Sequence, residues 1–387
     1  MSRLVNLQYL NDYEYEKLKN AVDNGMRELG LDNKVKKGTV VIKANLSVNR
    51  TKDAAETTHP AIVRAVAEYC MSRGCKCVLT DCPIGKHSES MLQSIYLSTG
   101  MLDMANLVNC ELNSNMETVD VEIADGVKTK NAKVLKIIDE ADAIINIGKL
   151  KFDENLGYLG AASNMFGVVP GEMKNVMINR LTTLADWGEL LVDLNEHYKD
   201  KVIVNILDAV VCLEAGHTQR MLNCIAMGDS VYSIDAAMFD ILDIKFANTY
   251  LKQARNRDLF DFKKPYKILG AKLDKFRVDD FSVLDYDSNK KIVQPKGYFK
   301  AHQERPTISK KACKGCQICS KICPSGAIMM RYDENSELFA EIDYSRCIFC
   351  KKCVLACPYK VVDVKTPLGY KAVIKDVEKY NKEKINT

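Results

Sequence analysis

Along most of the chain, short runs of hydrophobic residues alternate with segments whose apolar positions recur at helical spacing. The run at 38–46 is rich in Val and Ile and ends in polar Lys43 and Asn45, as a strand buried in a parallel sheet does. The next segment opens with Pro60, which favours the first turn of a helix, and stays largely apolar as far as Cys70. Further strands are expected at 76–81, 107–112, 119–123, 132–138, 142–151, 202–211 and 224–227, and further helices at 13–30, 88–98, 185–199 and 229–242. This alternation predicts an α/β domain with a mostly parallel sheet and flanking helices.

Two cysteine runs of identical spacing, Cys-x2-Cys-x2-Cys-x3-Cys-Pro, follow this pattern. They consist of Cys313, Cys316, Cys319 and Cys323, and of Cys347, Cys350, Cys353 and Cys357. Compact domains ligate [4Fe–4S] clusters with this spacing, and the fourth cysteine of each run serves the other cluster. We therefore expect two clusters with crossed ligation. Cluster 1 is assigned to Cys313, Cys316, Cys319 and Cys357, and cluster 2 to Cys323, Cys347, Cys350 and Cys353.

Structural zinc is the alternative for these cysteines, because Cys-x2-Cys pairs also bind that metal. Zinc sites favour separated pairs of ligands around one ion, whereas three cysteines at i, i+3 and i+6 suit three vertices of one cube. The spacing therefore favours clusters, and residues 306–367 resemble a bacterial two-cluster ferredoxin. Residues 310–387 hold 15 Lys and Arg against 9 Asp and Glu, an excess that would offset the negative charge of two oxidised clusters.

The length of 387 residues exceeds what one hydrophobic core usually occupies, so more than one domain is expected. We expect an α/β domain at 1–286, a linker rich in Lys, Gln and Pro at 287–311, a small α+β ferredoxin-like domain at 312–367, and a helical tail at 368–387.

Composition narrows the partners and the compartment. The net charge of +4 is too small to indicate a nucleic-acid partner. No run approaches the roughly 18 apolar residues that a membrane span needs, and the first residues do not resemble a signal peptide. Exposed clusters are lost to oxidation, so the 15 cysteines predict a reducing, cytoplasmic and anaerobic setting.

Polar residues gather where the expected core strands end, which in an open α/β sheet is where ligands bind. The candidates are Lys43, Asn45, Asp81, Lys149, Lys151, Asp208, Glu214 and His217. Ordinary solvated loops and helix caps are the alternative at each position, and His59 ahead of Pro60 fits a cap. Neither a Rossmann Gly-x-Gly-x-x-Gly after the first strand, nor a Walker A run, nor a Gly-x-Ser-x-Gly elbow occurs.

Seven short motifs occur in order over about residues 38–245: Lys43-Ala-Asn45, Thr58-His59-Pro60, Asp81-Cys82-Pro83, Lys149-Leu-Lys151, Ala162-Ser-Asn-Met-Phe-Gly167, Asp208 with Glu214, and Asp229-Ser-Val-Tyr-Ser-Ile-Asp235. Followed by the cysteine runs, they resemble the uncharacterised iron–sulfur centre proteins in which an α/β domain of unknown function, family 362, precedes a ferredoxin module. Members of that family commonly carry Lys-Leu-Lys-Thr-His and Leu-Lys-Asn. Here Phe152-Asp153 and Ala162-Ser163-Asn164 stand instead, so a basic and an imidazole group of the family pattern are absent.

These observations favour an electron carrier, because cubanes held by four cysteines have no open iron site for substrate. Its expected partner is a redox protein such as a ferredoxin, a flavodoxin or an oxidoreductase. The rival is an oxidoreductase whose α/β cleft binds a small anionic substrate through Lys43, Lys149 and Lys151. A third interpretation makes the clusters structural in a binding protein.

Overall fold

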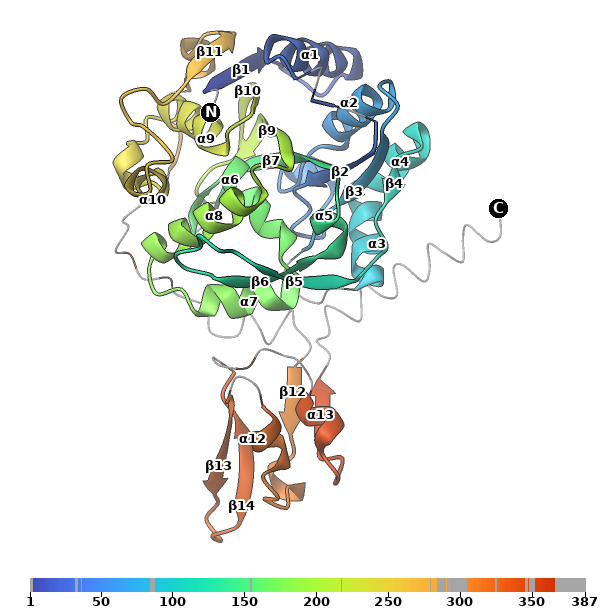
Figure 1. The fold of residues 1–387 in the computed structure, drawn as a ribbon, viewed down its shortest axis with the longest axis vertical. Coiled ribbons are helices and arrows are strands. Elements are labelled where there is room, and N and C mark those ends of the chain that lie inside the picture. The colour runs from blue at the N-terminus through green and yellow to red at the C-terminus, as the bar shows by residue number, and fades with distance from the viewer. Residues whose placement is uncertain are drawn as a thin grey trace. The chain divides into compact units, whose positions relative to one another are not determined.

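The computed structural model (Figure 1) describes residues 3–31, 34–35, 37–83, 88–153, 155–216, 218–278, 280–283, 290, 292, 305–323, 326–344, 347 and 352–365. The chain divides into two compact units. The first, an α/β unit, contains the described residues of 1–83, 92–170 and 181–293, and the second those of 84–91, 171–180 and 294–387.

A nine-stranded sheet forms the centre of the α/β unit in the described residues. Its strands are β1 (Leu4–Tyr9), β2 (Thr39–Ala44), β3 (Lys76–Thr80), β4 (Glu111–Leu112), β7 (Ala143–Asp153), β8 (Gly157–Leu159), β9 (Val202–Leu213), β10 (Gln219–Gly228) and β11 (Lys267–Gly270). The order is β11-β1-β10-β9-β7-β2-β3-β4, with β8 beside β7. The five strands from β9 to β4 run parallel, while β10 is antiparallel to both β9 and β1. The expected mostly parallel α/β sheet is therefore confirmed.

Helices and short turns connect the strands of this sheet. The helices are α1 (Tyr15–Glu28), α2 (Pro60–Met71), α3 (Glu89–Ser98), α4 (Met101–Val108), α5 (Lys136–Asp139), α6 (Ala161–Asn164), α7 (Gly171–Asn179), α8 (Leu184–Tyr198), α9 (Val231–Ile241) and α10 (Leu251–Asn256). Short 3-10 turns lie at Lys52–Ala54, Met165–Val168, Phe246–Asn248 and Leu273–Phe276, and β5 (Thr118–Glu122) pairs with β6 (Asn131–Leu135). In Figure 1, α1, α2 and α4 form one group beside the sheet, and α6, α8, α9 and α10 form another.

Local sequence explains why several helices begin where they do. The Glu14 side chain accepts hydrogen bonds from the first backbone amides of α1, and Thr183 caps α8 in the same way. Such caps satisfy amides that have no partner within the helix. On the sheet, Val41 and Ile42 of β2 have no exposed surface, because neighbouring strands and helices cover both faces. Within the described residues, no helix is long and apolar enough to cross a bilayer.

Three differences from the sequence-based scheme have physical causes. The range 107–112 is expected as a strand, but α4 continues to Val108 because Met101, Met104 and Ala105 are buried at helical spacing. The range 132–138 is strand only to Leu135 and then turns into α5. The first strand, β1, is missing from the predicted elements. Its place is decided by antiparallel pairing with the distant β10, in which Val5 lies opposite Gly228.

Residues 305–365 of the second unit, called the C-terminal unit below, contain a strand–helix–strand arrangement two times. Strand β12 (Arg305–Ile308) is followed by a 3-10 turn at Lys310–Ala312 and by α12 (Ile318–Ile322), and the hairpin β13 (Ile328–Tyr332) and β14 (Leu338–Ile342) leads to α13 (Lys352–Ala356) and β15 (Val362–Lys365). β12 pairs with β15 although it lies inside the range expected as a linker. The hydrophobic core of the C-terminal unit contains Cys319 and Cys353 together with apolar residues of β13, β14 and β15. The range 368–387, expected as a helical tail, lies outside the described residues.

Candidate functional site

Lys43 and Asp81 form a fully buried ion pair at the C-terminal ends of β2 and β3. Lys43 Nζ donates to Asp81 Oδ1 at 2.7 Å, to the Ala44 carbonyl at 2.9 Å and to Asn164 Oδ1 at 3.1 Å. The two side chains are 0% and 2% exposed. Asp81 also accepts from the Leu46 amide. An ammonium has three N–H bonds, so the donors of Lys43 are all occupied by protein acceptors.

A second buried pair joins Lys149 of β7 to Asp208 of β9. Lys149 Nζ lies 2.9 Å from Asp208 Oδ2 and 3.1 Å from the Tyr13 hydroxyl, and the charged side chains are 1% and 0% exposed. Asp208 Oδ1 accepts from the Tyr13 hydroxyl at 2.9 Å. Burial, with the nearby Asp208 carboxylate, raises the pKa of Tyr13, so this phenol stays protonated and donates.

Lys151 is bound differently, because its hydrogen-bond acceptors are all uncharged. Its Nζ donates to Ser47 Oγ at 2.9 Å, to the Glu56 carbonyl at 2.8 Å and to Asn45 Oδ1 at 3.3 Å. Burial lowers the pKa of Lys151 to about 8, an effect that Glu56 and more distant carboxylates partly offset. Lys151 therefore has a charge that no carboxylate contacts within the described residues, and it titrates closer to neutrality than an exposed lysine.

His59 lies over the second pair and caps α2. Its Nδ1 accepts from the Ala61 amide at 3.2 Å, and its own amide donates to Asp208 Oδ2 at 3.1 Å. The imidazole stacks on Tyr13 with ring centroids 3.8 Å apart. Burial lowers the pKa of His59 to about 4, so the neutral ring carries its proton on Nε2. The expected cap is confirmed, and the structure adds a position beside Tyr13 and Asp208.

These groups meet at the place in the sheet where the chain changes direction. From β2 the chain proceeds outward to β3 and β4, and it then returns to the other side of β2 to form β7 and β9. Lys43 of β2 is in register with Asn146 of β7. Crevices at the carboxyl ends of strands on either side of such a switch point are where open α/β sheets bind ligands. The sequence placed Lys43, Asp81, Lys149, Lys151 and Asp208 at strand ends, and the structure adds that Lys43 pairs with Asp81 and Lys149 with Asp208.

The short turn formed by α6 and the 3-10 residues Met165–Val168 supports the first ion pair. Gly167 approaches it so closely that a Cβ there would clash with both Asp81 Oδ1 and Lys43 Nζ. Asn164 bridges β2 and β7 by donating to the Lys43 carbonyl at 3.2 Å and to Asn146 Oδ1 at 2.8 Å. The motif Ala162 to Gly167 is therefore explained by packing against the strand ends.

Asp235 of α9 fixes the start of that turn. This fully buried carboxylate accepts from the Ala161 and Ala162 amides at 2.8 and 3.1 Å, and from the Tyr158 and Tyr250 hydroxyls at 2.9 and 2.8 Å. Burial raises the pKa of Asp235, against the lowering effect of these four donors. Asp235 itself does not contact Lys43. It holds the start of α6, the helix whose last residue, Asn164, contacts Lys43.

Glu214 is a sequence candidate that belongs to neither of the two pairs. Glu214 follows β9 and forms an ion pair with Arg220 at 3.1 Å. His217 lies outside the described residues. Phe152, where the family commonly carries a threonine, is buried and contacts the rings of Tyr158 and Phe281. Sequence reasoning missed Tyr13, because nothing local distinguishes it from an ordinary residue ahead of a helix.

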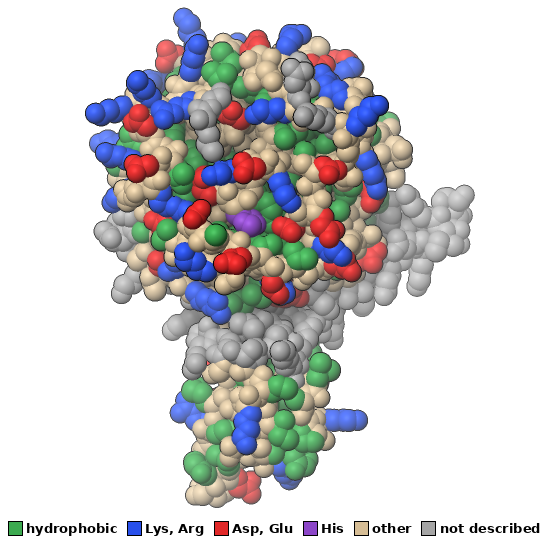
Figure 2. Space-filling model, viewed as in Figure 1, with side chains coloured by type: hydrophobic (Ala, Val, Ile, Leu, Met, Phe, Trp, Pro, Cys, Tyr) green, Lys and Arg blue, Asp and Glu red, His purple; other side chains and the backbone are tan. Residues whose placement is uncertain are grey.

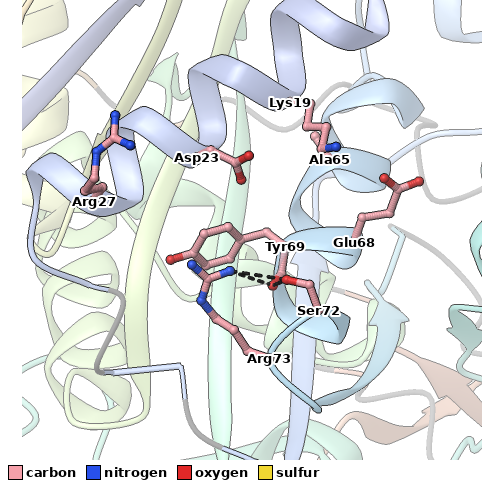
Figure 3. A pocket seen from close by; sticks show the side chains of 8 residues that line it. All are labelled: Lys19, Asp23, Arg27, Ala65, Glu68, Tyr69, Ser72 and Arg73. Carbon is pink, nitrogen blue, oxygen red and sulfur yellow. Dashed lines mark hydrogen bonds between the residues drawn. The ribbon is translucent and has the colours of Figure 1, made fainter.

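A hollow of about 530 Å³ lies elsewhere on the α/β unit, between α1 and the end of α2 (Figure 3). His59 caps the start of α2, whereas Arg73, which lines the hollow, follows the end of that helix. The hollow and the His59 side chain are therefore at opposite ends of α2. Arg73 is engaged by the Tyr69 carbonyl and Ser72 Oγ, as the dashed lines in Figure 3 show. Glu68 is likewise bound to Arg64. This hollow brings none of the predicted site residues together.

The cysteine-bearing unit contains a cavity lined by the four cysteines expected for cluster 1. Cys313, Cys316 and Cys319 line it from the first run, and Cys357 joins them from the second. Burial raises the pKa of the Cys319 thiol, so iron coordination, rather than the surroundings alone, would hold it as a thiolate. Four thiols around one space are the donor set of a cubane. Among the described residues, no three His, Cys, Asp or Glu side chains converge on a position for a single metal ion.

Part of the second quartet is also described. Cys353 is buried in the core of this unit, and Cys323 and Cys347 pack against that core. The Ala327 amide donates to Cys323 Sγ at 3.3 Å. Amide donors of this kind stabilise the reduced, more negative state of a cluster. Cys350 lies outside the described residues. The seven cysteines of the α/β unit are buried, as expected of small apolar residues.

Comparison with known families identifies both parts of the chain. The family described as "Domain of unknown function (DUF362)" matches residues 40–240, just over half of the chain, and the "4Fe-4S dicluster domain" matches residues 312–361. A 4Fe-4S dicluster domain defines a class of protein that transfers electrons. The chain belongs to the DUF362 family, with a dicluster domain following the family domain, as the resemblance implies.

Individual relatives match one part of the chain or the other. A thylakoid-associated protein of Synechocystis is 26% identical over 235 residues, which are 59% of this chain and 70% of that protein. One component of an ion-translocating oxidoreductase complex from Methanosarcina acetivorans is 42% identical over 53 residues, 14% of this chain and 18% of the relative. The electron transport protein HydN of Escherichia coli is 39% identical over 54 residues, 13% and 28% of the two chains. These last two relatives are therefore matched over less than a third of their own length.

A solved structure gives a weaker likeness. The lactate racemase apoprotein of Thermoanaerobacterium thermosaccharolyticum, 12% identical, superposes with a TM-score of 0.38 over 60% of this chain and 56% of that one.

Proposed function

We propose that this protein is a cytoplasmic electron carrier that binds two [4Fe–4S] clusters and exchanges single electrons with a redox partner protein. Its α/β domain binds the ligand or partner that the electrons serve. The observation that carries the proposal is that Cys357 of the second run lines one cavity with Cys313, Cys316 and Cys319 of the first. Crossed ligation is typical of two cubanes held by this cysteine spacing, whereas two separate zinc knuckles would each use cysteines of one run.

The residues of this chain have distinct roles in that function. The cysteine thiolates hold the iron, and backbone amides such as that of Ala327 donate to sulfur and favour the reduced state. When bound, the clusters supply reversible one-electron chemistry. The lysine excess around the cysteines reduces the electrostatic cost of adding an electron, because it offsets the negative charge of the loaded unit.

Anaerobic reconstitution with iron and sulfide, followed by EPR of the dithionite-reduced protein, tests the proposal. We expect about eight iron atoms per chain, as two cubanes require, and the broadened spectrum of two interacting [4Fe–4S]+ centres. Stoichiometric zinc with almost no iron would overturn it. Cys224→Ser provides a matched control, since this cysteine is buried in the α/β unit and is not assigned to a cluster.

The second candidate is an oxidoreductase whose α/β cleft binds a small anion, and the contacts of Lys151 favour it. Lys43 and Lys149 are each paired with a buried aspartate, whereas Lys151 contacts only neutral acceptors among the described residues. An anion at this strand end would supply the missing charge for Lys151. Lys151→Met should therefore abolish turnover with a small carboxylate or phosphate substrate while leaving iron content unchanged. A different result would favour the carrier function. In that case a reduced flavodoxin or ferredoxin exchanges electrons with this variant as it does with the wild type, and added anions change the rate of exchange for neither protein.

A further inference from the structure

Charge is unevenly distributed along the C-terminal unit. The two cysteine-bearing segments, 305–327 and 344–362, contain nine Lys and Arg residues and no Asp or Glu. The hairpin between them, 328–343, contains five acidic residues and a single arginine. Two oxidised clusters add about four negative charges, so the cysteine-bearing segments keep a positive excess after loading. The net charge of the loaded unit is therefore small only because the acidic hairpin offsets the segments that hold the clusters, and these segments themselves remain basic.

Exposed apolar side chains occur on the same segments. Ile318 and Ile322, one turn apart on α12, are 41% and 44% exposed, and Tyr359 is 52% exposed. Ile318 and Tyr359 line the cavity of the cluster 1 cysteines, together with the exposed Cys316 and with Lys314. Of the described residues, none that lines this cavity is acidic. On the face drawn in Figure 2, hydrophobic and basic side chains are spread over the C-terminal unit, and acidic side chains appear at its lower end.

Three lysines accompany these apolar residues: Lys314 lines the same cavity, and Lys321 and Lys360 are the sequence neighbours of Ile322 and Tyr359. Lys314, Lys321 and Lys360 are exposed, and none of them forms an ion pair with the described residues. By contrast, Arg331 of the hairpin is paired with Glu341 at 3.1 Å. Cations around an apolar centre match the usual anatomy of a protein interface, in which a charged rim surrounds a less polar core.

We propose that Ile318, Ile322 and Tyr359, with the rim of Lys314, Lys321 and Lys360, form the docking surface for an acidic redox protein. We call these six residues the docking face. The proposal rests on the proposed function, since it places the exchange of electrons at the exposed edge of cluster 1. With cluster 1 bound at Cys313, Cys316, Cys319 and Cys357 and reduced to the 1+ state, it would give up one electron and return to the 2+ state. An acidic flavodoxin would take that electron, with one proton from solvent, to form its flavin semiquinone.

Charge selects this occupant over two others. A second copy of the chain would bring two basic docking faces together, which like-charge repulsion disfavours. A nucleic acid would match the lysines, but its phosphates would lie against the negatively charged cluster and the exposed isoleucines. An acidic protein surface with an apolar centre satisfies both the lysines and the apolar side chains.

Stopped-flow mixing of the reconstituted, reduced full-length protein with oxidised acidic flavodoxin tests the docking face. We expect the second-order rate constant to fall as salt is raised, because opposite charges steer the encounter. The Lys321→Glu/Lys360→Glu variant should react at least tenfold more slowly at low salt. Lys252→Glu, which changes an exposed lysine of α10, should react within twofold of the wild type. A basic cytochrome c should show the reverse preference and react faster with the double variant.

The apolar centre is tested by a second pair of variants. Ile322→Ser should slow the reaction with flavodoxin at both low and high salt, whereas Leu107→Ser, at a 65% exposed site in α4, should leave it unchanged. Iron content and EPR are measured first in every variant. Absence of [4Fe–4S]+ signals in the wild type overturns the proposed function. Normal clusters, together with equal rates of reaction with flavodoxin in all variants, would overturn only the docking face. A wild-type dimer that the Ile322→Ser substitution dissociates would also overturn it, because a second copy of the chain would then be the occupant.

Discussion

Lys149 Nζ and Asp208 Oδ2 lie 2.9 Å apart on adjacent parallel strands, with 1% and 0% of their side chains exposed. The Tyr13 hydroxyl contacts both partners, and the His59 amide donates to the same aspartate. A charge pair so completely removed from water is stable only when its partners and their hydrogen bonds are all present. The pair therefore links the N-terminal segment, α2, β7 and β9 into one unit.

Breaking this pair should be costly. Asp208→Ala leaves the Lys149 ammonium buried without its counter-charge, and we expect the free energy of unfolding to fall by about 3–5 kcal/mol. Urea denaturation followed by the fluorescence of Trp187, the single tryptophan, measures the change. Lys149→Met combined with Asp208→Leu should recover part of the loss, because it removes both charges. A loss below about 1 kcal/mol for Asp208→Ala would show that water reaches the pair.

Gly167→Ala should disrupt the first ion pair without changing a charge. The added methyl group would overlap both Asp81 and Lys43, which have no room to move inside the core. We expect a loss of about 1–3 kcal/mol, typical of an overpacked core. The same denaturation experiment measures it. A variant as stable as the wild type would mean that the turn at residues 165–168 adjusts without cost.

Asp235→Ala should loosen the turn that carries Asn164. The substitution leaves two amides and two tyrosine hydroxyls without their shared acceptor, at about 1–3 kcal/mol for each group left unsatisfied. Hydrogen exchange of the Ala161 and Ala162 amides should accelerate. Asp235→Asn retains one oxygen acceptor and should have a smaller effect. Unchanged exchange in the alanine variant would contradict the positioning role.

The depressed pKa of His59 predicts a pH dependence of stability. The folded protein holds this imidazole neutral down to about pH 4, whereas the unfolded chain protonates it near pH 6.5. The unfolded state therefore binds more protons between these values, and the free energy of unfolding should decrease by up to about 3 kcal/mol as pH falls through that window. His59→Asn keeps a helix-capping oxygen and should remove this part of the slope. A slope identical to that of the wild type would assign it to other groups.

Crossed ligation predicts which cluster each cysteine variant loses. Cys357→Ser should damage the cluster held by Cys313, Cys316 and Cys319, and Cys323→Ser should damage the other. In each variant iron should fall to about half, and the interaction broadening should disappear because one centre remains. If Cys313→Ser and Cys323→Ser instead give the same residual EPR spectrum, each run ligates its own cluster and the crossed assignment is wrong.

The sequence by itself was sufficient for the cysteine-bearing unit and for most of the sheet. The match to a dicluster domain follows from cysteine spacing over a few residues, and the strand at Thr39–Ala44 and the helix at Pro60–Met71 follow from local apolar patterns and a proline. The ends of the expected strands also contained the polar residues that form the two buried ion pairs. These features depend on interactions within short stretches of chain, which is why the linear order of residues reveals them.

Only the tertiary structure decided how those polar residues are used. Lys43 meets Asp81 across 38 positions and Lys149 meets Asp208 across 59, so two predicted anion-binding lysines are neutralised from within. Lys151 contacts no carboxylate among the described residues, and Tyr13 enters the network from a segment with no distinguishing pattern. Long-range pairing of this kind depends on which strands become neighbours, and the strand order is set by packing of the whole sheet rather than by any local stretch.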